Sequence, residues 1–207
     1  MCIRDRVFMG CIDKECTKKI AIKIVKGYDE LMKHEYKMGK YISQFGGVKP
    51  FALRKCDKMS ILYTEYANNG NLLNFLKINK DKLLPIHFRT IITQILHALY
   101  KINKKYPTFR HNDLHLENIL INTSKPSRVK IIKINNTQFK VHDIGLQTLI
   151  SDFGLSTLKN FKNPEINYDP AWYQKHSGIS TNSHYLYDTH CFLTRMRASI
   201  KGYGIQS

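Results

Sequence analysis

The stretch FRHNDLHLENIL, residues 109–120, places charged and amide side chains between apolar ones. Asp113 and Asn118 lie five positions apart within it. Burying such groups without partners costs roughly 1 to 3 kcal/mol each, so packing alone does not explain them. A carboxylate can accept the proton of a substrate hydroxyl, and an amide oxygen can bind a divalent cation. Asp113 is therefore a candidate for accepting or orienting the proton of a hydroxyl, and Asn118 is a candidate metal ligand.

A second carboxylate suited to a metal lies in ISDFGLS, where an apolar run ends at Asp152. Gly154 lets the backbone turn sharply just after this acid, at a place where the acid must face a ligand. Mg²⁺ prefers one or two carboxylates together with phosphate oxygens. Asp152 and Asn118 together therefore predict a magnesium site.

A cation for phosphate groups is predicted at Lys23 in IAIK, an apolar run that we place on the third strand of a sheet. A lysine among apolar neighbours needs a partner, because lysine is rarely buried unpaired. Glu35 in the following helix is the preferred partner, and Glu30 is the alternative.

Short strands and one helix would position the lysine. The runs at 6–13 and 18–26 predict a hairpin, residues 29–42 predict a helix that begins at an Asp cap, and FALRKCD and SILYTEYA predict a second hairpin. The turn-forming NNGN at 68–71 marks a boundary, after which the pattern becomes helical.

The acids and amides would lie on the second half of the chain. Residues 85–104 carry an apolar stripe at helical spacing, which predicts a core helix. Four apolar runs, NILIN, RVKIIKI, TQFKVHDIG and LQTLISDFG, then predict short strands in one small sheet.

The composition of the 207 residues, with 43% hydrophobic side chains, is that of a globular protein. No apolar run is long enough to span a membrane, and MCIRDRVFMG has charges where a signal peptide needs apolar residues. The net charge of +17 is spread along the chain without a nucleic-acid signature, so we expect a solvated basic surface rather than nucleic-acid binding. Five scattered cysteines argue against a disulfide framework and a zinc site, and predict a reducing, cytoplasmic setting.

The three motifs IAIK, HNDLHLEN and DFG, in this order, resemble the protein-kinase set V-A-I-K, H-R-D-L-x-x-x-N and D-F-G. The resemblance covers about residues 6 to 200. It implies an α+β, two-lobed protein-kinase-like fold, with a small antiparallel β lobe at 1–67 and a mainly helical lobe at 68–207. The implied reaction moves the γ-phosphoryl group of ATP, with Mg²⁺, to Ser/Thr hydroxyls of a protein substrate.

The resemblance also implies roles for single residues. Lys23 would hold phosphates beside Glu35, Asp113 would be the base, and Asn118 and Asp152 would hold Mg²⁺. His115 stands where Ser/Thr kinases have a phosphate-contacting lysine.

The segment TEYANNGN resembles the kinase hinge. The adenine site that this implies consists of the gatekeeper Thr64, the backbone of Glu65 and Ala67, and the apolar side chains of Val7, Ala21 and Leu120. YDTHCFL resembles the F helix, whose Asp188 would be buried and would brace the catalytic loop, and His111 is expected to pack beneath the metal-binding turn.

Several departures qualify the resemblance. No glycine precedes Val7, so the chain is expected to begin inside the glycine-rich loop, with a defective phosphate clamp. Asn112 replaces the usual arginine, which argues against control by activation-loop phosphorylation. Asp113 and Asp152 are 39 positions apart, about twice the usual separation, as in kinases of large DNA viruses. No A-P-E follows DFG, because the NPE at 163–165 comes too early.

Two alternative functions stay open. HNDLHLEN also resembles the H-G-D-L-H-x-x-N loop of aminoglycoside and choline-type kinases, and His115 favours that interpretation. The absent glycine loop favours a pseudokinase or nucleotide-binding scaffold, whereas the presence of Lys23, Asp113, Asn118 and Asp152 together opposes it.

Overall fold

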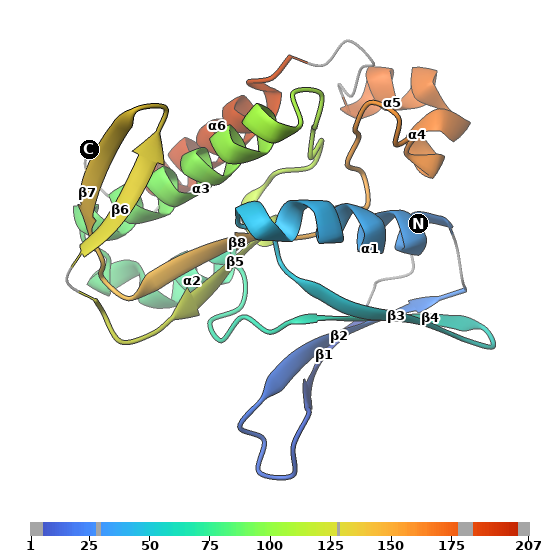
Figure 1. Ribbon diagram of the computed structural model, residues 1–207, viewed down its shortest axis with the longest axis horizontal. Coiled ribbons are helices and arrows are strands. Elements are labelled where there is room, and N and C mark those ends of the chain that lie inside the picture. The colour runs from blue at the N-terminus through green and yellow to red at the C-terminus, as the bar shows by residue number, and fades with distance from the viewer. Residues whose placement is uncertain (1–5, 28–29, 128, 178–183, 203–207) are drawn as a thin grey trace.

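A computed structural model describes residues 6–27, 30–127, 129–177 and 184–202 (Figure 1). The chain begins with a four-stranded antiparallel sheet of strand order β1-β2-β4-β3. Helix α1, Glu30–Ile42, contacts β3 and β4 of this sheet and, beyond it, helix α4. The strands are β1 Arg6–Cys11, β2 Lys19–Lys26, β3 Pro50–Cys56 and β4 Met59–Glu65.

The remaining chain is mainly helical and carries two small sheets. Its helices are α2 Leu72–Asn79, α3 Pro85–Lys105, α4 Pro164–Tyr168, α5 Pro170–Ser177 and α6 Tyr187–Gly202, with short 3-10 turns at Lys80–Lys82 and Leu116–Asn118. A third 3-10 turn, Ser43–Phe45, follows α1 in the first part of the chain. Its strands are β5 Ile119–Thr123, β6 Val129–Ile134, β7 Thr137–His142 and β8 Leu146–Ile150. The predicted α+β architecture is confirmed, and the boundary at 67/68, which falls between β4 and α2, stays a prediction.

Helix α3 forms the centre of the helical region. Pro85 occupies its first turn, where a missing N–H costs nothing. Ile91, Ile95, Leu99 and Ile102 of the predicted stripe are buried, in one core cluster with residues of α2, the stretch 109–121, β8 and α6. The most deeply buried large side chains of this core include Met38, Ile42, Leu72, Leu76, Ile91, Ile95, Ile102, Phe109, Leu114, Ile119, Ile121 and Phe192. Among the described residues, no helix combines the length and apolarity that crossing a bilayer requires.

The prediction of one small sheet for residues 119–150 was wrong. β5 pairs with β8, whereas β6 pairs with β7 in a separate hairpin. The hairpin turns at Asn135, whose φ of 51° lies in the left-handed region that Asn tolerates. The phenolic oxygen of Tyr100 on α3 bonds the Asn135 side chain at 2.6 Å, so the hairpin is held by α3 rather than by β5 or β8.

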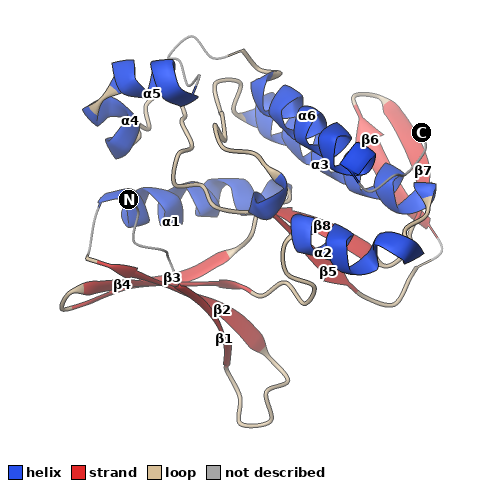
Figure 2. Ribbon diagram, turned by 180° about the vertical axis from the view of Figure 1, so that it is seen from behind, coloured by secondary structure: helices blue, strands red, loops and turns tan. Residues whose placement is uncertain are grey.

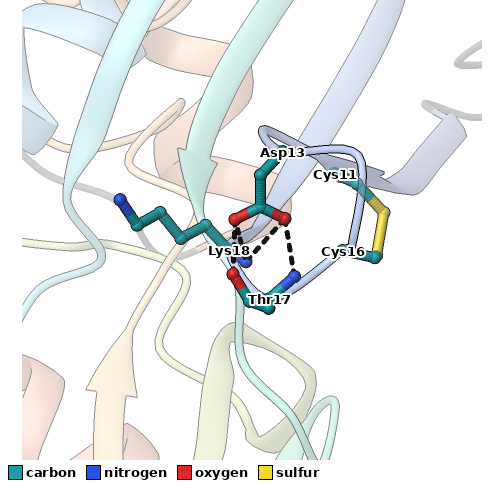
Figure 3. Close-up of a disulfide and its surroundings, with 5 residues drawn as sticks. All are labelled: Cys11, Asp13, Cys16, Thr17 and Lys18. Atoms are coloured by element: carbon teal, nitrogen blue, oxygen red, sulfur yellow. Dashed lines mark hydrogen bonds between the residues drawn. A yellow bond between two sulfur atoms is a disulfide. The ribbon is translucent and has the colours of Figure 1, made fainter.

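The argument against disulfides was also wrong, because Cys11 and Cys16 form one (Figure 3). The β1–β2 loop brings the two residues together, and the Asp13 carboxylate closes the same loop by accepting from the backbone N–H groups of Thr17 and Lys18 at 2.6 and 3.1 Å. The reducing compartment was predicted because the cysteines were expected to be unpaired, and the disulfide removes that argument.

Two further expectations concern the start of the chain. Lys23 lies on β2, the second strand, and not on a third strand. The expected remnant of a glycine-rich loop falls on residues 1–5, which lie outside the described part of the chain.

Candidate active site

A cleft of about 620 Å³ lies between the four-stranded sheet and two stretches of chain, residues 117–120 at the start of β5 and residues 151–153 after β8. This volume falls within the roughly 300 to 1,000 Å³ of small-molecule sites. The described residues that line it include eight of the predicted site residues, namely Val7, Ala21, Lys23, Glu35, Thr64, Asn118, Leu120 and Asp152.

Lys23 lies between two carboxylates in this cleft. Its Nζ donates to Glu35 Oε2 at 2.9 Å, and Asp152 Oδ2 is 3.8 Å away. The side chains of Lys23 and Glu35 are 15% and 9% exposed, so water screens this pair little. Glu30, the alternative partner, instead bonds Lys33. Strand β2 and helix α1 thus place one cation where phosphate oxygens could meet it.

Asp152 faces the cleft because of its backbone conformation. Its φ of 61° is left-handed, a conformation that Asp adopts more readily than most residues. The N–H of the preceding residue, Ser151, donates to the carbonyl of Asn118 at 2.9 Å. This bond ties the end of β8 to the turn before β5, which brings two candidate metal ligands together.

Asn118 is oriented by Asp113. Its Nδ2 donates to the Asp113 carbonyl at 2.9 Å and to the Asp113 carboxylate at 3.3 Å. Because the nitrogen of the amide is used in this way, its oxygen is the atom left for a cation. The amide oxygen of Asn118 and the carboxylate of Asp152 fit Mg²⁺, which takes few protein ligands and completes its shell with water and phosphate oxygens.

Asp113 and His115 form a coupled pair, with Nε2 of His115 3.5 Å from Asp113 Oδ2. Burial acts to raise the pKa of Asp113, but the contacts with His115, His111 and Asn118 together hold the pKa below its usual value. The hydrogen bond to Asp113 in turn raises the pKa of His115. Asp113 is therefore ionised at neutral pH, as a proton acceptor must be.

Four predicted site residues do not line the large cleft: Glu65, Ala67, Asp113 and His115. Asp113 borders it through Asn118, whereas His115 faces a second cleft of about 520 Å³ beside Arg195 of α6. The N–H of Glu65 donates to the carbonyl of Lys49 at 2.8 Å, so only its carbonyl could meet an adenine edge.

Asp188 on α6 supports the turn that carries Asp113. The carboxylate is 3% exposed and accepts from the backbone N–H groups of His111 and Asn112 at 2.7 and 3.0 Å. Burial raises its pKa, against the lowering effect of His111 and of these two bonds. Nε2 of His111 lies 2.9 Å from the carbonyl of Ser151, directly before Asp152, which confirms its expected structural place.

The family model for protein tyrosine and serine/threonine kinases matches residues 4–180. This chain belongs to the protein kinase family. A relative from Acanthamoeba polyphaga mimivirus, named as a serine/threonine-protein kinase, is 30% identical over 144 residues, which are 67% of this chain and 30% of that protein. A Dictyostelium discoideum protein with the same kind of name is 37% identical over 114 residues, 52% of this chain and 9% of that protein. The kinase chain thus spans less than a third of either relative.

The kinase segment that follows Asp152 is held by an amide that the sequence did not single out. Asn163 is 1% exposed, and its Nδ2 donates to the carbonyls of Gly154 and Ser156 at 2.6 and 3.1 Å. Its oxygen accepts from the first N–H groups of α4. The signal that could have revealed it is the dipeptide Asn163–Pro164, since Asn at the N-cap and Pro at the first helical position mark a helix start.

Two more buried side chains form hydrogen bonds with the same kinase segment. Asn112, which replaces the family's arginine, donates to the carbonyl of Leu155 at 2.8 Å and to Thr157 Oγ1 at 3.1 Å. His34, next to Glu35 on α1, bonds the carbonyl of Ser156 at 2.8 Å, and burial lowers its pKa. Uncharged hydrogen bonds from Asn112 and His34 therefore hold residues 154–157 in place. An arginine at position 112 would instead pair with a phosphorylated residue.

Replacing Asn163 with Ala should lower the free energy of unfolding by roughly 2 to 4 kcal/mol, because both a helix cap and the donor to the Gly154 carbonyl are lost. Calorimetry of this variant beside Asn136→Ala, a change in the exposed hairpin turn, measures the effect. Equal melting temperatures for the two variants would show that Asn163 does not hold this segment.

Proposed function

We propose that this chain is an ATP- and Mg²⁺-dependent protein kinase that transfers the γ-phosphoryl group of ATP to Ser/Thr hydroxyls of a protein substrate. The supporting observation is that one cleft joins the paired Lys23 to the oxygens of Asn118 and Asp152, directly beside the ionised Asp113. The names of both relatives support the Ser/Thr assignment.

Each polar residue has one task in this proposal. Lys23, fixed by Glu35, binds phosphate oxygens, and Asn118 and Asp152 hold the cation. Bound Mg²⁺ supplies charge neutralisation for the phosphates. Asp113 orients the acceptor hydroxyl and takes its proton, and His115, whose pKa is raised, places positive charge next to that carboxylate.

The adenine site is proposed in the part of the cleft away from the candidate metal ligands Asn118 and Asp152. Ala21 and Lys23 are two positions apart on β2, so they share one face of the strand. Val7 on β1 and Leu120 on β5 contribute apolar surface to the same cleft. Thr64 lies at the end of β4, and the carbonyl of Glu65 and the backbone of Ala67 follow it as hydrogen-bonding groups.

A small-molecule kinase is the second candidate, favoured by the contact between His115 and Asp113. Phosphate transfer from labelled ATP to a mixed Ser/Thr peptide pool, compared with transfer to aminoglycosides and choline, separates the two acceptor classes.

The nucleotide site is tested by thermal shift with ATP, with and without Mg²⁺. A ligand at about a hundred times its Kd adds about 2.7 kcal/mol to the free energy of unfolding, which is a rise of roughly 5 to 10 °C for a chain of this size. We expect Mg²⁺ to enlarge the shift, and Asp152→Asn to abolish the gain.

The matched control is Asp81→Asn, an exposed acid remote from the cleft, which should keep the full gain. If ATP with Mg²⁺ leaves the melting temperature of the wild type unchanged, the scaffold alternative is supported instead.

A further inference from the structure

The β6–β7 hairpin lies away from the nucleotide cleft. It extends the chain between β5 and β8, and both views place it beside α3, far from the β1–β4 sheet (Figures 1 and 2). None of the residues that line the 620 Å³ cleft comes from it. The proposed phosphoryl transfer therefore leaves the hairpin without a task.

A separate cleft of about 230 Å³ lies between α3 and this hairpin. Its volume is below the roughly 300 to 1,000 Å³ of small-molecule sites, so it suits one or two side chains. The described residues that line it are Ile86, Arg89, Thr90, Thr93 and Gln94 of α3 with Ile132, Lys140, Val141 and His142 of the hairpin.

The cleft has an apolar lining with no free amide. Ile132 is buried, and Ile86 and Val141 are half-buried. The side chain of Gln94 is fully engaged inside the fold, since its Nε2 donates to the carbonyl of Leu146 at 2.7 Å and its oxygen accepts from the N–H of Thr148 at 2.8 Å. An aliphatic side chain is the matching occupant, because it would contact Ile86, Ile132 and Val141, and Gln94 would lose no hydrogen-bond partner to it.

The rim of the cleft is positively charged. Arg89 and Lys140 are both exposed there, and none of the described lining residues is acidic. Helix α3 carries one Arg and three Lys residues without any Asp or Glu, and β6 and β7 carry three Lys residues, again without an acid. The nearby Asp143 is bound by Lys130 at 3.1 Å and by Ser127, so it is already neutralised.

The cleft runs along β7 and reaches Ile132 of β6. Three consecutive residues of that strand, 140–142, line it, although successive side chains of a strand point to opposite faces. In the described part of the chain, β7 pairs with β6 alone, so one edge of β7 has no strand beside it. An extended segment can add to such an edge while its side chains enter the adjacent pocket.

We propose that the α3–β7 cleft docks an extended segment of a protein partner in which aliphatic residues alternate with Asp and Glu. The aliphatic side chain fills the apolar lining, and the flanking carboxylates meet Arg89 and Lys140. A protein segment fits better than nucleic acid, because no Phe, Tyr or Trp is among the described lining residues to stack on a base.

Fluorescence polarisation without nucleotide tests the docking site and does not depend on catalysis. The probe is a fluorescein-labelled peptide in which Leu alternates with Asp and Glu, compared with a peptide that has Ser in place of Leu and with a labelled oligothymidine. The variant is Arg89→Glu with Lys140→Glu, and the control, Lys77→Glu with Lys105→Glu, makes the same change in net charge on exposed positions outside the cleft.

We expect the Leu-containing peptide to bind the wild type and the control with similar affinity, and to bind the Arg89/Lys140 variant at least about ten-fold more weakly, a loss of about 1.4 kcal/mol. The Ser-containing peptide should bind more weakly than the Leu-containing one. Equal weakening of peptide binding in both double variants would mean that the net positive charge of the protein, and not this cleft, binds the peptide. Tighter binding of the oligothymidine than of the Leu-containing peptide would make this a nucleic-acid site. Absence of peptide binding to the wild type would overturn the proposal outright.

Discussion

Changing Asp113 to Asn lowers the rate of phosphoryl transfer by about 10²- to 10⁴-fold, the range that a positioned general base contributes, while ATP binding changes little. An amide cannot accept the hydroxyl proton, although it can still bond Asn118, whose Nδ2 contacts both the carbonyl and the carboxylate of Asp113. Asp113 also lies outside the lining of the nucleotide cleft. The loss should therefore appear in kcat and not in the KM for ATP.

Steady-state kinetics at saturating Mg²⁺ measure this effect, with Asp81→Asn as the control for loss of one exposed carboxylate. A variant that turns over at the wild-type rate would remove Asp113 from its proposed role. A rise in the KM for ATP with unchanged kcat would make it a binding residue instead.

Changing Asp188 to Ala should lower the free energy of unfolding by roughly 2 to 5 kcal/mol. The carboxylate is buried and accepts from two backbone N–H groups, which the variant leaves without their acceptor at a cost of about 1 to 3 kcal/mol each. For a chain of this size the melting temperature falls by roughly 5 to 15 °C.

Scanning calorimetry of Asp188→Ala beside Asp81→Ala separates this effect from the loss of a surface charge, since Asp81 is exposed. Thermal unfolding of the two variants at the same temperature would mean that water satisfies the His111 and Asn112 amides. The melting temperature of Asp188→Asn should lie between those of Asp188→Ala and the wild type, because one amide oxygen can replace only part of the carboxylate.

Local patterns predicted the parts of the site that depend on short spacing. Asp113 and Asn118 are fixed relative to each other by one tight turn, and Lys23 lies on a strand followed directly by the helix of Glu35. Glu35 was predicted over Glu30 as the partner that would fix the Lys23 ammonium for phosphate contact, and the structure contains this ion pair at 2.9 Å.

Contacts made at long range were less predictable. The pairing of four short strands between 119 and 150 was missed, because apolar runs of five or six residues carry no information on which partner they choose. The Cys11–Cys16 disulfide depends on a loop conformation that cysteine spacing does not reveal. The bonds of Asn163 and His34 to distant carbonyl groups could not be predicted, because every residue has a carbonyl and its residue type does not reveal which one is bound.

The position of Lys23 between Glu35 and Asp152 has a consequence for how ligand affinity is determined. When only a fraction of molecules is competent to bind, the observed Kd is weakened by that same fraction. Here helix α1 already holds Glu35 against Lys23, and Asp152 already stands 3.8 Å from the same ammonium. Because this ion pair is formed in the structure, an activator that worked only by shifting α1 toward the sheet would gain no ligand affinity through it.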